Sequence, residues 1–173
     1  ILLYTEMIVS EAIDRGDRQK LLSFNLEEKP VALQLGGSSP KLLSNAAKIG
    51  EEFGYDEINL NLGCPSKKVQ KNKFGACLIK EPKLVADCLS EMQSKTKLPV
   101  TVKTRIGYDQ VEDYEHLYNF IDLLKSTGVK IFIIHARKAI LGNFTPKQNL
   151  NIPPLKYEMV YKLKEDFKEL DII

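Results

Sequence analysis

Short apolar runs alternate with longer segments of helical periodicity along this chain, and that alternation limits the fold more than any other feature. Runs rich in β-branched or apolar residues occupy positions 2–7, 31–35, 57–62, 100–106 and 131–136. Amphipathic helical patterns lie between most of them, at positions 40–53, 82–92, 113–127 and 157–167. Because strands joined through helices run in the same direction, this order predicts parallel βαβ units.

Composition excludes several classes of protein. The chain has 173 residues, of which 43% are hydrophobic and 28% are charged, and this excludes disorder, collagen and coiled coil. The net charge of +2 is too small to indicate nucleic-acid binding by itself. Apolar runs fall far short of the roughly 20 residues that span a bilayer, and no signal peptide opens the chain. We therefore expect a cytoplasmic protein that does not bind membranes.

The polar residues at the strand ends distinguish between two architectures. An open nucleotide-binding sheet usually carries a glycine-rich loop after its first strand, and none follows positions 2–7. Instead, polar side chains stand near the C-terminal end of nearly every predicted strand: Glu6, Gln34, Asn59, Asn61, Lys103, Arg105, His135 and Arg137. Polar groups that converge from many strands on one mouth are typical of a TIM barrel. We predict an α/β fold of the (β/α)8 barrel type.

The predicted barrel is incomplete. Five strands and the start of a sixth, at positions 171–173, can be recognised, whereas a whole barrel has eight strands in about 250 residues. The chain also begins at Ile1 with residues that already have a strand-like pattern. We expect residues 1–173 to form a partial barrel domain that holds strands 2–6 and the start of strand 7.

Cys64 is the first candidate for chemistry. It lies in a sharp Gly-Cys-Pro turn directly after a predicted strand that ends in two asparagines. A thiol in a loop at a barrel mouth can act as an acid or a nucleophile. We expect Cys77 and Cys88, which have apolar neighbours, to be inert core residues. Three cysteines without a CxxC pair predict neither a disulfide framework nor a zinc site, and with two histidines in the chain we predict no metal site.

Strand alternation turns Lys103 and Arg105 into the barrel. An inward cation is costly unless it meets an anion or a polar ring system. One alternative pairs Lys103 with an internal carboxylate such as Glu6. Gln34, which precedes two glycines, offers an amide that can both donate and accept.

Further positive charge follows two of the strands. Arg137 and Lys138 stand beside His135 at a strand end, which favours an anion or RNA site there. Four lysines crowd the segment after Cys64, at positions 67, 68, 71 and 73. Such a run is commonly a solvated face, and contact with a phosphate backbone is the alternative.

Four segments together resemble the tRNA-dihydrouridine synthases. They are PVALQLGG at 30–37, YDEINLNLGCPS at 55–66, VTVKTRIG at 100–107 and FIIHARKA at 132–139. The similarity is greatest to the A-type subfamily, which modifies D-loop uridines 20 and 20a, and positions 4–7 and 151–155 fit it too. The resemblance covers essentially the whole chain in the right order, so it is highly specific.

This resemblance implies a TIM barrel that holds FMN at its mouth, with NADPH as the reductant and tRNA as the partner. Gln34, Lys103 and His135 would contact the isoalloxazine ring. Asn61 would help to seat a flipped-out uracil, and Cys64 would donate the proton. The residues expected near the substrate and the tRNA backbone are Arg105, Arg137, Lys138 and Lys147.

The sequence also departs from the family pattern. The first strand, the last strands that bind the FMN phosphate and the C-terminal helical RNA-binding domain of the family have no counterpart in residues 1–173, so we expect the fragment alone to be inactive. Leu150 occupies a position at which the subfamily usually has an arginine.

The same residues allow two other functions. One is an FMN barrel dehydrogenase that acts on a free pyrimidine, and the other is a non-catalytic RNA-binding protein that has lost its flavin.

Overall fold

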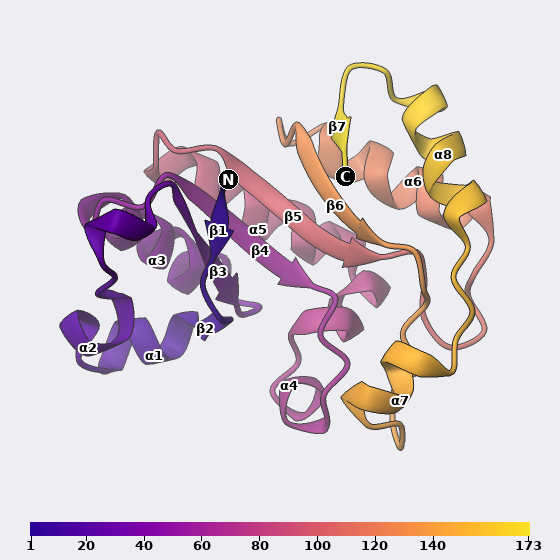
Figure 1. The fold of residues 1–173 in the computed structure, drawn as a ribbon, viewed down its shortest axis with the longest axis horizontal. Coiled ribbons are helices and arrows are strands. Elements are labelled where there is room, and N and C mark those ends of the chain that lie inside the picture. Colours follow the sequence, from indigo (N-terminus) through magenta and orange to yellow (C-terminus); the bar gives the residue numbers. More distant parts are fainter.

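The computed structural model describes residues 1–173 as one curled parallel sheet with helices packed on its outer side (Figure 1). The strands are β1 (Leu3–Tyr4), β2 (Ile8–Val9), β3 (Val31–Gly36), β4 (Glu57–Leu62), β5 (Val100–Arg105), β6 (Ile131–His135) and β7 (Asp171–Ile172). Their order is β1-β3-β4-β5-β6-β7, β2 also pairs with β3, and every pairing is parallel. The sheet is a half-barrel, which confirms the predicted incomplete TIM barrel.

Long helices connect the strands where the periodicity predicts them. These are α3 (Pro40–Glu52), α5 (Pro82–Lys95), α6 (Tyr114–Lys125) and α8 (Tyr157–Asp166). Helices of at most six residues were not predicted, because so short a segment shows no helical periodicity: α1 (Ser10–Arg15), α2 (Arg18–Leu22), α4 (Lys67–Lys71), α7 (Pro146–Asn151) and the 3-10 segments Leu26–Glu28 and Gly75–Lys80. None of the helices is long and apolar enough to cross a membrane.

The predicted strand at positions 2–7 is wrong in its extent, because only Leu3–Tyr4 form a strand within it and a second short strand, Ile8–Val9, follows after it. β1 pairs Tyr4 with Ala32, whereas β2 pairs Ile8 with Leu35. From Tyr4 to Ile8 the edge of the sheet covers four residues, whereas β3 covers three from Ala32 to Leu35. The edge therefore has one extra residue between β1 and β2. The backbone N–H of Gln34 consequently donates to the Thr5 hydroxyl, at 3.0 Å. An irregularity of this kind bends an edge strand and ends its regular pairing.

The core lies between the sheet and its helices. All six residues of β3 are buried, as is all of β4 except Asn61. A strand is buried on both faces only if each face is covered, and here the outer face meets α3. A Cβ on Gly50 of α3 would lie 2.7 Å from Leu33 and 2.8 Å from Ile58, so these two side chains point outward. The residues that alternate with them along β3 and β4 point into the barrel, where their polar side chains form hydrogen bonds with one another.

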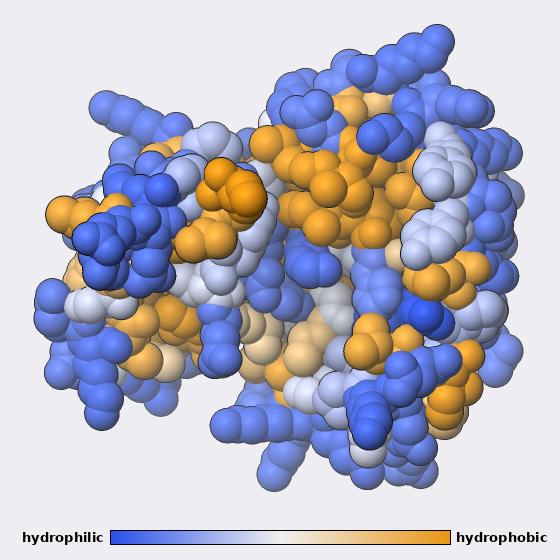
Figure 2. Space-filling view, viewed as in Figure 1, coloured by the Kyte–Doolittle hydropathy of each residue, from blue (hydrophilic) through white to orange (hydrophobic).

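The half-barrel leaves the sheet open at both ends. β1 and β2 form one edge and β7 the other. Apolar side chains gather near β6 and β7 on the face shown in Figure 2, and Ile173, which follows β7, is 67% exposed. Unpaired strand edges and exposed apolar surface are places where another segment or partner can pair or pack.

Candidate functional site

The C-terminal ends of β4, β5 and β6 meet around a cavity of about 280 Å³. Its lining brings together six of the residues singled out in the sequence: Asn61, Cys64, Lys103, Arg105, His135 and Leu150. A larger hollow of about 600 Å³ lies between β2, α1 and α4, but none of these six residues lines it. We take the smaller cavity as the candidate site because the reactive groups converge there.

Cys64 is held by a turn that Asn61 organises. The Oδ1 atom of Asn61 accepts the backbone N–H groups of Gly63 and Cys64, each at 3.0 Å. On the other side, Cys64 O accepts the backbone N–H of Ala76 at 2.9 Å. Cys64 is half-buried and lines the cavity. Its backbone is held on one side by Asn61 and on the other by Ala76.

Gly75 makes the second of these contacts possible. Its φ of 70° lies in the left-handed region, and a Cβ there would lie 2.6 Å from Cys64 O and 2.5 Å from Val69 Cγ1. Only glycine lets the 3-10 segment approach the Cys64 turn this closely.

The amide of Asn61, which lines the cavity, is bonded to that of Gln34, which does not line it. Asn61 Nδ2 donates to Gln34 Oε1 at 2.7 Å, and Gln34 Nε2 donates to Asn59 Oδ1 at 3.0 Å. Each amide nitrogen carries two hydrogens. One N–H of Gln34 and one of Asn61 therefore remain for a ligand.

Lys103 reaches the cavity without a carboxylate partner. The structure contains no ion pair between Lys103 and Glu6, so the alternative that paired them is wrong. Burial, followed by the nearby Arg105, lowers the pKa of the Lys103 ammonium. An uncompensated cation of this kind favours an anionic ligand.

Arg105 is 5% exposed and binds three backbone carbonyls. Its Nε donates to Gly63 O at 2.9 Å, and its Nη1 donates to Lys138 O at 3.1 Å and Asn149 O at 3.2 Å. The guanidinium thereby joins the loops after β4 and β6 to α7. The predicted contact of Arg105 with substrate stays a prediction. In the structure, Arg105 holds these loops in place through their carbonyls.

His135 ends β6 among cations. Burial, then Arg105, Lys103 and Arg137, lower its pKa to about 4. The imidazole is therefore neutral at pH 7 and can both donate and accept a hydrogen bond.

The other predicted tRNA-binding residues lie outside the lining of the cavity. Arg137 donates to Pro153 O, and the Lys138 ammonium pairs with Glu112 at 3.0 Å. Lys147 on α7 is exposed and makes no ion pair. The four lysines in and after α4 are exposed as well.

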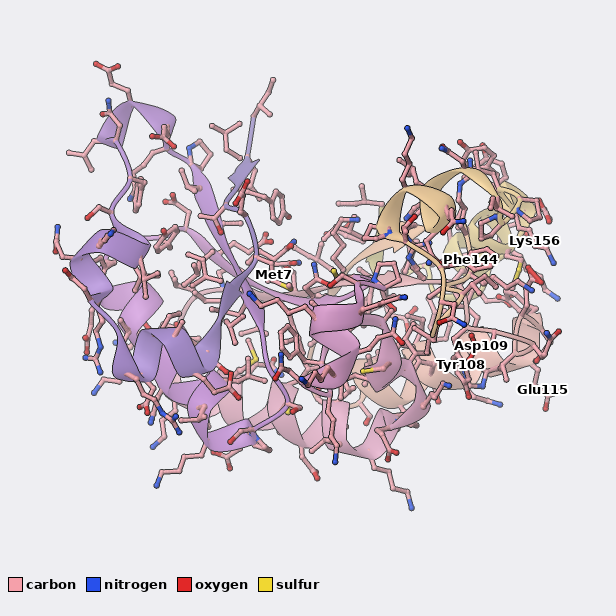
Figure 3. The ribbon with its side chains drawn as sticks, turned by 90° about the horizontal axis from the view of Figure 1, so that it is seen from below. Met7, Tyr108, Asp109, Glu115, Phe144 and Lys156 are labelled. Atoms are coloured by element: carbon pink, nitrogen blue, oxygen red, sulfur yellow. The ribbon has the colours of Figure 1, made fainter.

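Sequence reasoning missed two residues that hold this region together. Asn149 is fully buried, and its side chain bonds both the N–H and the C=O of Ile140. Glu112 also pairs with Lys156, at 3.2 Å. Figure 3 views the molecule from below and shows Tyr108, Asp109, Phe144 and Lys156 on the same side of it, away from Met7. These contacts join distant segments, so no local pattern could have indicated them.

The remaining cysteines lie outside the site. Cys88 is fully buried, and burial raises its pKa to about 12. The Cys77 thiol donates to Phe74 O at 3.0 Å, and burial raises its pKa too. Both observations fit the structural roles predicted for them.

A family model and the similar curated proteins both carry the name dihydrouridine synthase. The family model described as Dihydrouridine synthase (Dus) matches residues 1–173. A tRNA-dihydrouridine(20/20a) synthase of Synechocystis sp. is 57% identical over 169 residues, which are 98% of this chain and 51% of that protein. One from Shewanella oneidensis is 54% identical over 171 residues, 99% of this chain and 51% of that protein. The chain therefore spans about half the length of the curated relatives it matches.

A solved structure shares the fold alone. A putative fructose-1,6-biphosphate aldolase from Coccidioides immitis superimposes with a TM-score of 0.54 at 17% identity. The match covers 96% of this chain and 57% of that one.

Replacing Gly75 with alanine should destabilise the protein by at least about 2 kcal/mol, because the new Cβ is strained at positive φ and also meets the Cys64 carbonyl. Gly142→Ala is the matched control, since Gly142 has a φ of 91° with nothing within 4 Å; it should cost only the conformational strain, about 1 kcal/mol. Urea unfolding measures both, and equal losses would contradict the close contact.

The lowered pKa of His135 predicts a pH effect on stability. Between pH 6.5, the ordinary histidine pKa, and about 4, the unfolded chain binds a proton that the folded site rejects, so stability falls as pH falls. His135→Asn should remove this loss, on the order of 1 kcal/mol because solvent screens the half-exposed ring. Urea unfolding of both proteins at pH 7 and at pH 4.5 tests this, and an identical pH dependence would contradict it.

Proposed function

This chain belongs to the dihydrouridine synthase family, as its sequence resemblance predicted, and on that basis we propose that the protein carrying it reduces uridine to 5,6-dihydrouridine in the D-loop of tRNA. The observation that supports this most directly is the cavity that joins the Cys64 thiol to Asn61, Lys103 and His135. An acid, an amide and a cation at one barrel mouth suit the reduction of a flat, polar ring.

The residues at the mouth fit FMN. Lys103, Arg105 and Arg137 lie near His135, and no carboxylate lines the cavity, so an anionic group would be stabilised there. Gln34, Lys103 and His135 would hold the flavin ring, through a free amide N–H, an ammonium and a neutral imidazole. When bound, FMN would supply the hydride that adds to uracil C6, with NADPH as the reductant.

Cys64 would supply the proton. Its thiol gives H⁺ to uracil C5 as hydride arrives at C6, so the C5–C6 double bond becomes single and sulfur is left as a thiolate. Water then returns a proton to the sulfur. Arg105 Nε donates to the carbonyl of Gly63, the residue before Cys64 in the turn, so a guanidinium lies close to the backbone that holds the thiol.

Asn61 would orient the base. Its Oδ1 is occupied by two backbone N–H groups and one of its Nδ2 hydrogens by Gln34, which leaves a single N–H for a uracil carbonyl. A base within a stack cannot reach this recessed group, so the uridine has to flip out of the RNA.

The exposed cations of the segments after Cys64 and on α7 would contact the tRNA backbone. Lys147 and the four lysines in and after α4 are free to do so, and Arg137 lies closer to the cavity. Lys138 pairs with Glu112, so its predicted RNA contact would compete with that ion pair. The helical domain expected beyond residue 173 would extend this surface.

Cys64→Ala in the full-length protein should lower dihydrouridine formation in tRNA by about 10²-fold or more, because the general acid is lost. Cys77→Ala is the matched control, since that thiol bonds a backbone carbonyl outside the cavity, and it should retain activity. Mass spectrometry of the tRNA product measures both. Unchanged activity of the Cys64 variant would refute the assignment, and turnover of free uracil but not tRNA would favour a free-pyrimidine dehydrogenase.

Leu150→Arg should strengthen tRNA binding several-fold at low salt, because Leu150 is 54% exposed and lines the cavity. The slope of log K against log salt should steepen by about 0.7–0.9, the effect of one further phosphate contact. Ile152→Arg adds the same charge on a residue that is 58% exposed but does not line the cavity. Equal gains in the two variants, measured by salt-dependent filter binding, would show that position 150 has no special contact.

A further inference from the structure

A chain of hydrogen bonds runs through the interior of the half-barrel and ends at the Cys64 turn. At its inner end, Thr101 Oγ1 donates to the Glu57 carboxylate at 2.6 Å. Asn59 Nδ2 donates to Thr101 Oγ1 at 2.8 Å, and Gln34 Nε2 donates to Asn59 Oδ1 at 3.0 Å. All four side chains are buried, Glu57 being 6% exposed and Gln34 9% exposed.

The chain continues to the mouth without a break. Asn61 Nδ2 donates to Gln34 Oε1 at 2.7 Å, and Asn61 Oδ1 accepts the N–H groups of Gly63 and Cys64. Five side chains from β3, β4 and β5 thus connect the start of β4 with the turn that holds the cysteine. Neighbouring strands supply the links in register, because Gln34 pairs with Asn59, and Asn59 with Thr101.

The two ends of this chain dictate one direction for every bond in it. An ionised carboxylate can only accept, and a backbone N–H can only donate. With Glu57 at one end and the Cys64 turn at the other, a single orientation of each amide satisfies all the groups. Reversing any one amide would set a donor against a donor or an acceptor against an acceptor in a buried site.

Tyr4 strengthens the inner end. Its hydroxyl donates to the same Glu57 oxygen at 2.8 Å, and burial together with this bond raises the pKa of the phenol, which keeps it a donor. Glu57 therefore receives two hydroxyl hydrogen bonds, and the Thr101 hydroxyl is left to accept from Asn59.

We propose that Glu57 and Thr101 are positioning residues for the reactive thiol, acting through the amides of Asn59, Gln34 and Asn61. They fix which atom each amide presents, and so keep Asn61 Oδ1 beneath the Cys64 turn and one N–H of Asn61, which lines the cavity, outside the chain of hydrogen bonds. The inference rests on the proposed function only in naming Cys64 as the group whose position matters.

Two substitutions remove this control in different ways. Glu57→Gln keeps the size of the side chain but gives it an amide that can donate to Thr101, so the inner end no longer dictates a direction. Thr101→Val keeps the branched shape but cuts the link and leaves Asn59 Nδ2 without an acceptor. Thr101→Ser is the matched control, because it retains the hydroxyl.

The test measures Cys64 itself in the full-length protein. The rate at which iodoacetamide alkylates Cys64 is followed by mass spectrometry of its peptide over a series of pH values. In Glu57→Gln and Thr101→Val the amide chain behind Asn61 is held less firmly, and with it the acceptor beneath the Cys64 turn, so alkylation should become several-fold faster with an altered pH profile, while Thr101→Ser should match the parent. Dihydrouridine formation should fall about tenfold in the same two variants.

The outcomes separate the inference from the proposed function. Parental alkylation rates in both Glu57→Gln and Thr101→Val would overturn the inference, whatever the activity. Alkylation needs neither cofactor nor tRNA, so it decides the matter even if Cys64→Ala leaves dihydrouridine formation intact and the proposed function fails. If Thr101→Val does not fold, the isosteric Glu57→Gln decides alone.

Discussion

The polar interior of the half-barrel is the constraint on which the site depends. Parallel strands covered by helices on the outside still turn half of their side chains inward, and here those side chains are amides, hydroxyls and a carboxylate. A buried polar group without a partner costs about 1–3 kcal/mol, so these residues must satisfy one another across the strands. Their hydrogen bonds end on the backbone of Gly63 and Cys64. The reactive cysteine is therefore placed by the same bonds that make the interior stable.

Charge at the mouth follows a different rule. Arg105 is buried but bonds carbonyls instead of a carboxylate, and Lys103 has no acidic partner. Their charges stay available, and burial, together with these two cations and Arg137, lowers the pKa of His135 and keeps it neutral. The one strongly paired acid nearby, Glu112, lies outside the cavity lining and neutralises Lys138 and Lys156. The site thus remains positive where an anion would bind.

Much of this arrangement could be predicted from local patterns. Alternating strands and helices indicate the barrel, and period-two alternation places Lys103 and Arg105 inside. The Gly-Cys-Pro turn after an asparagine-rich strand indicates Cys64. The split edge strand could not be predicted, because the extra residue between Tyr4 and Ile8 is visible only in the pairing with β3. Asn149 and Glu112 were missed because their partners lie in other segments of the chain.

The sequence by itself determined the order of the elements, the family, and the residues that carry the proposed chemistry, since each of these is a property of neighbours along the chain. Tertiary structure alone decided how those residues are used. It left Lys103 without Glu6 as an ion-pair partner, placed three backbone carbonyls around Arg105, and connected Glu57 to the Cys64 turn through four further side chains on three strands. The register between strands sets such contacts, and register depends on the packing of the whole sheet.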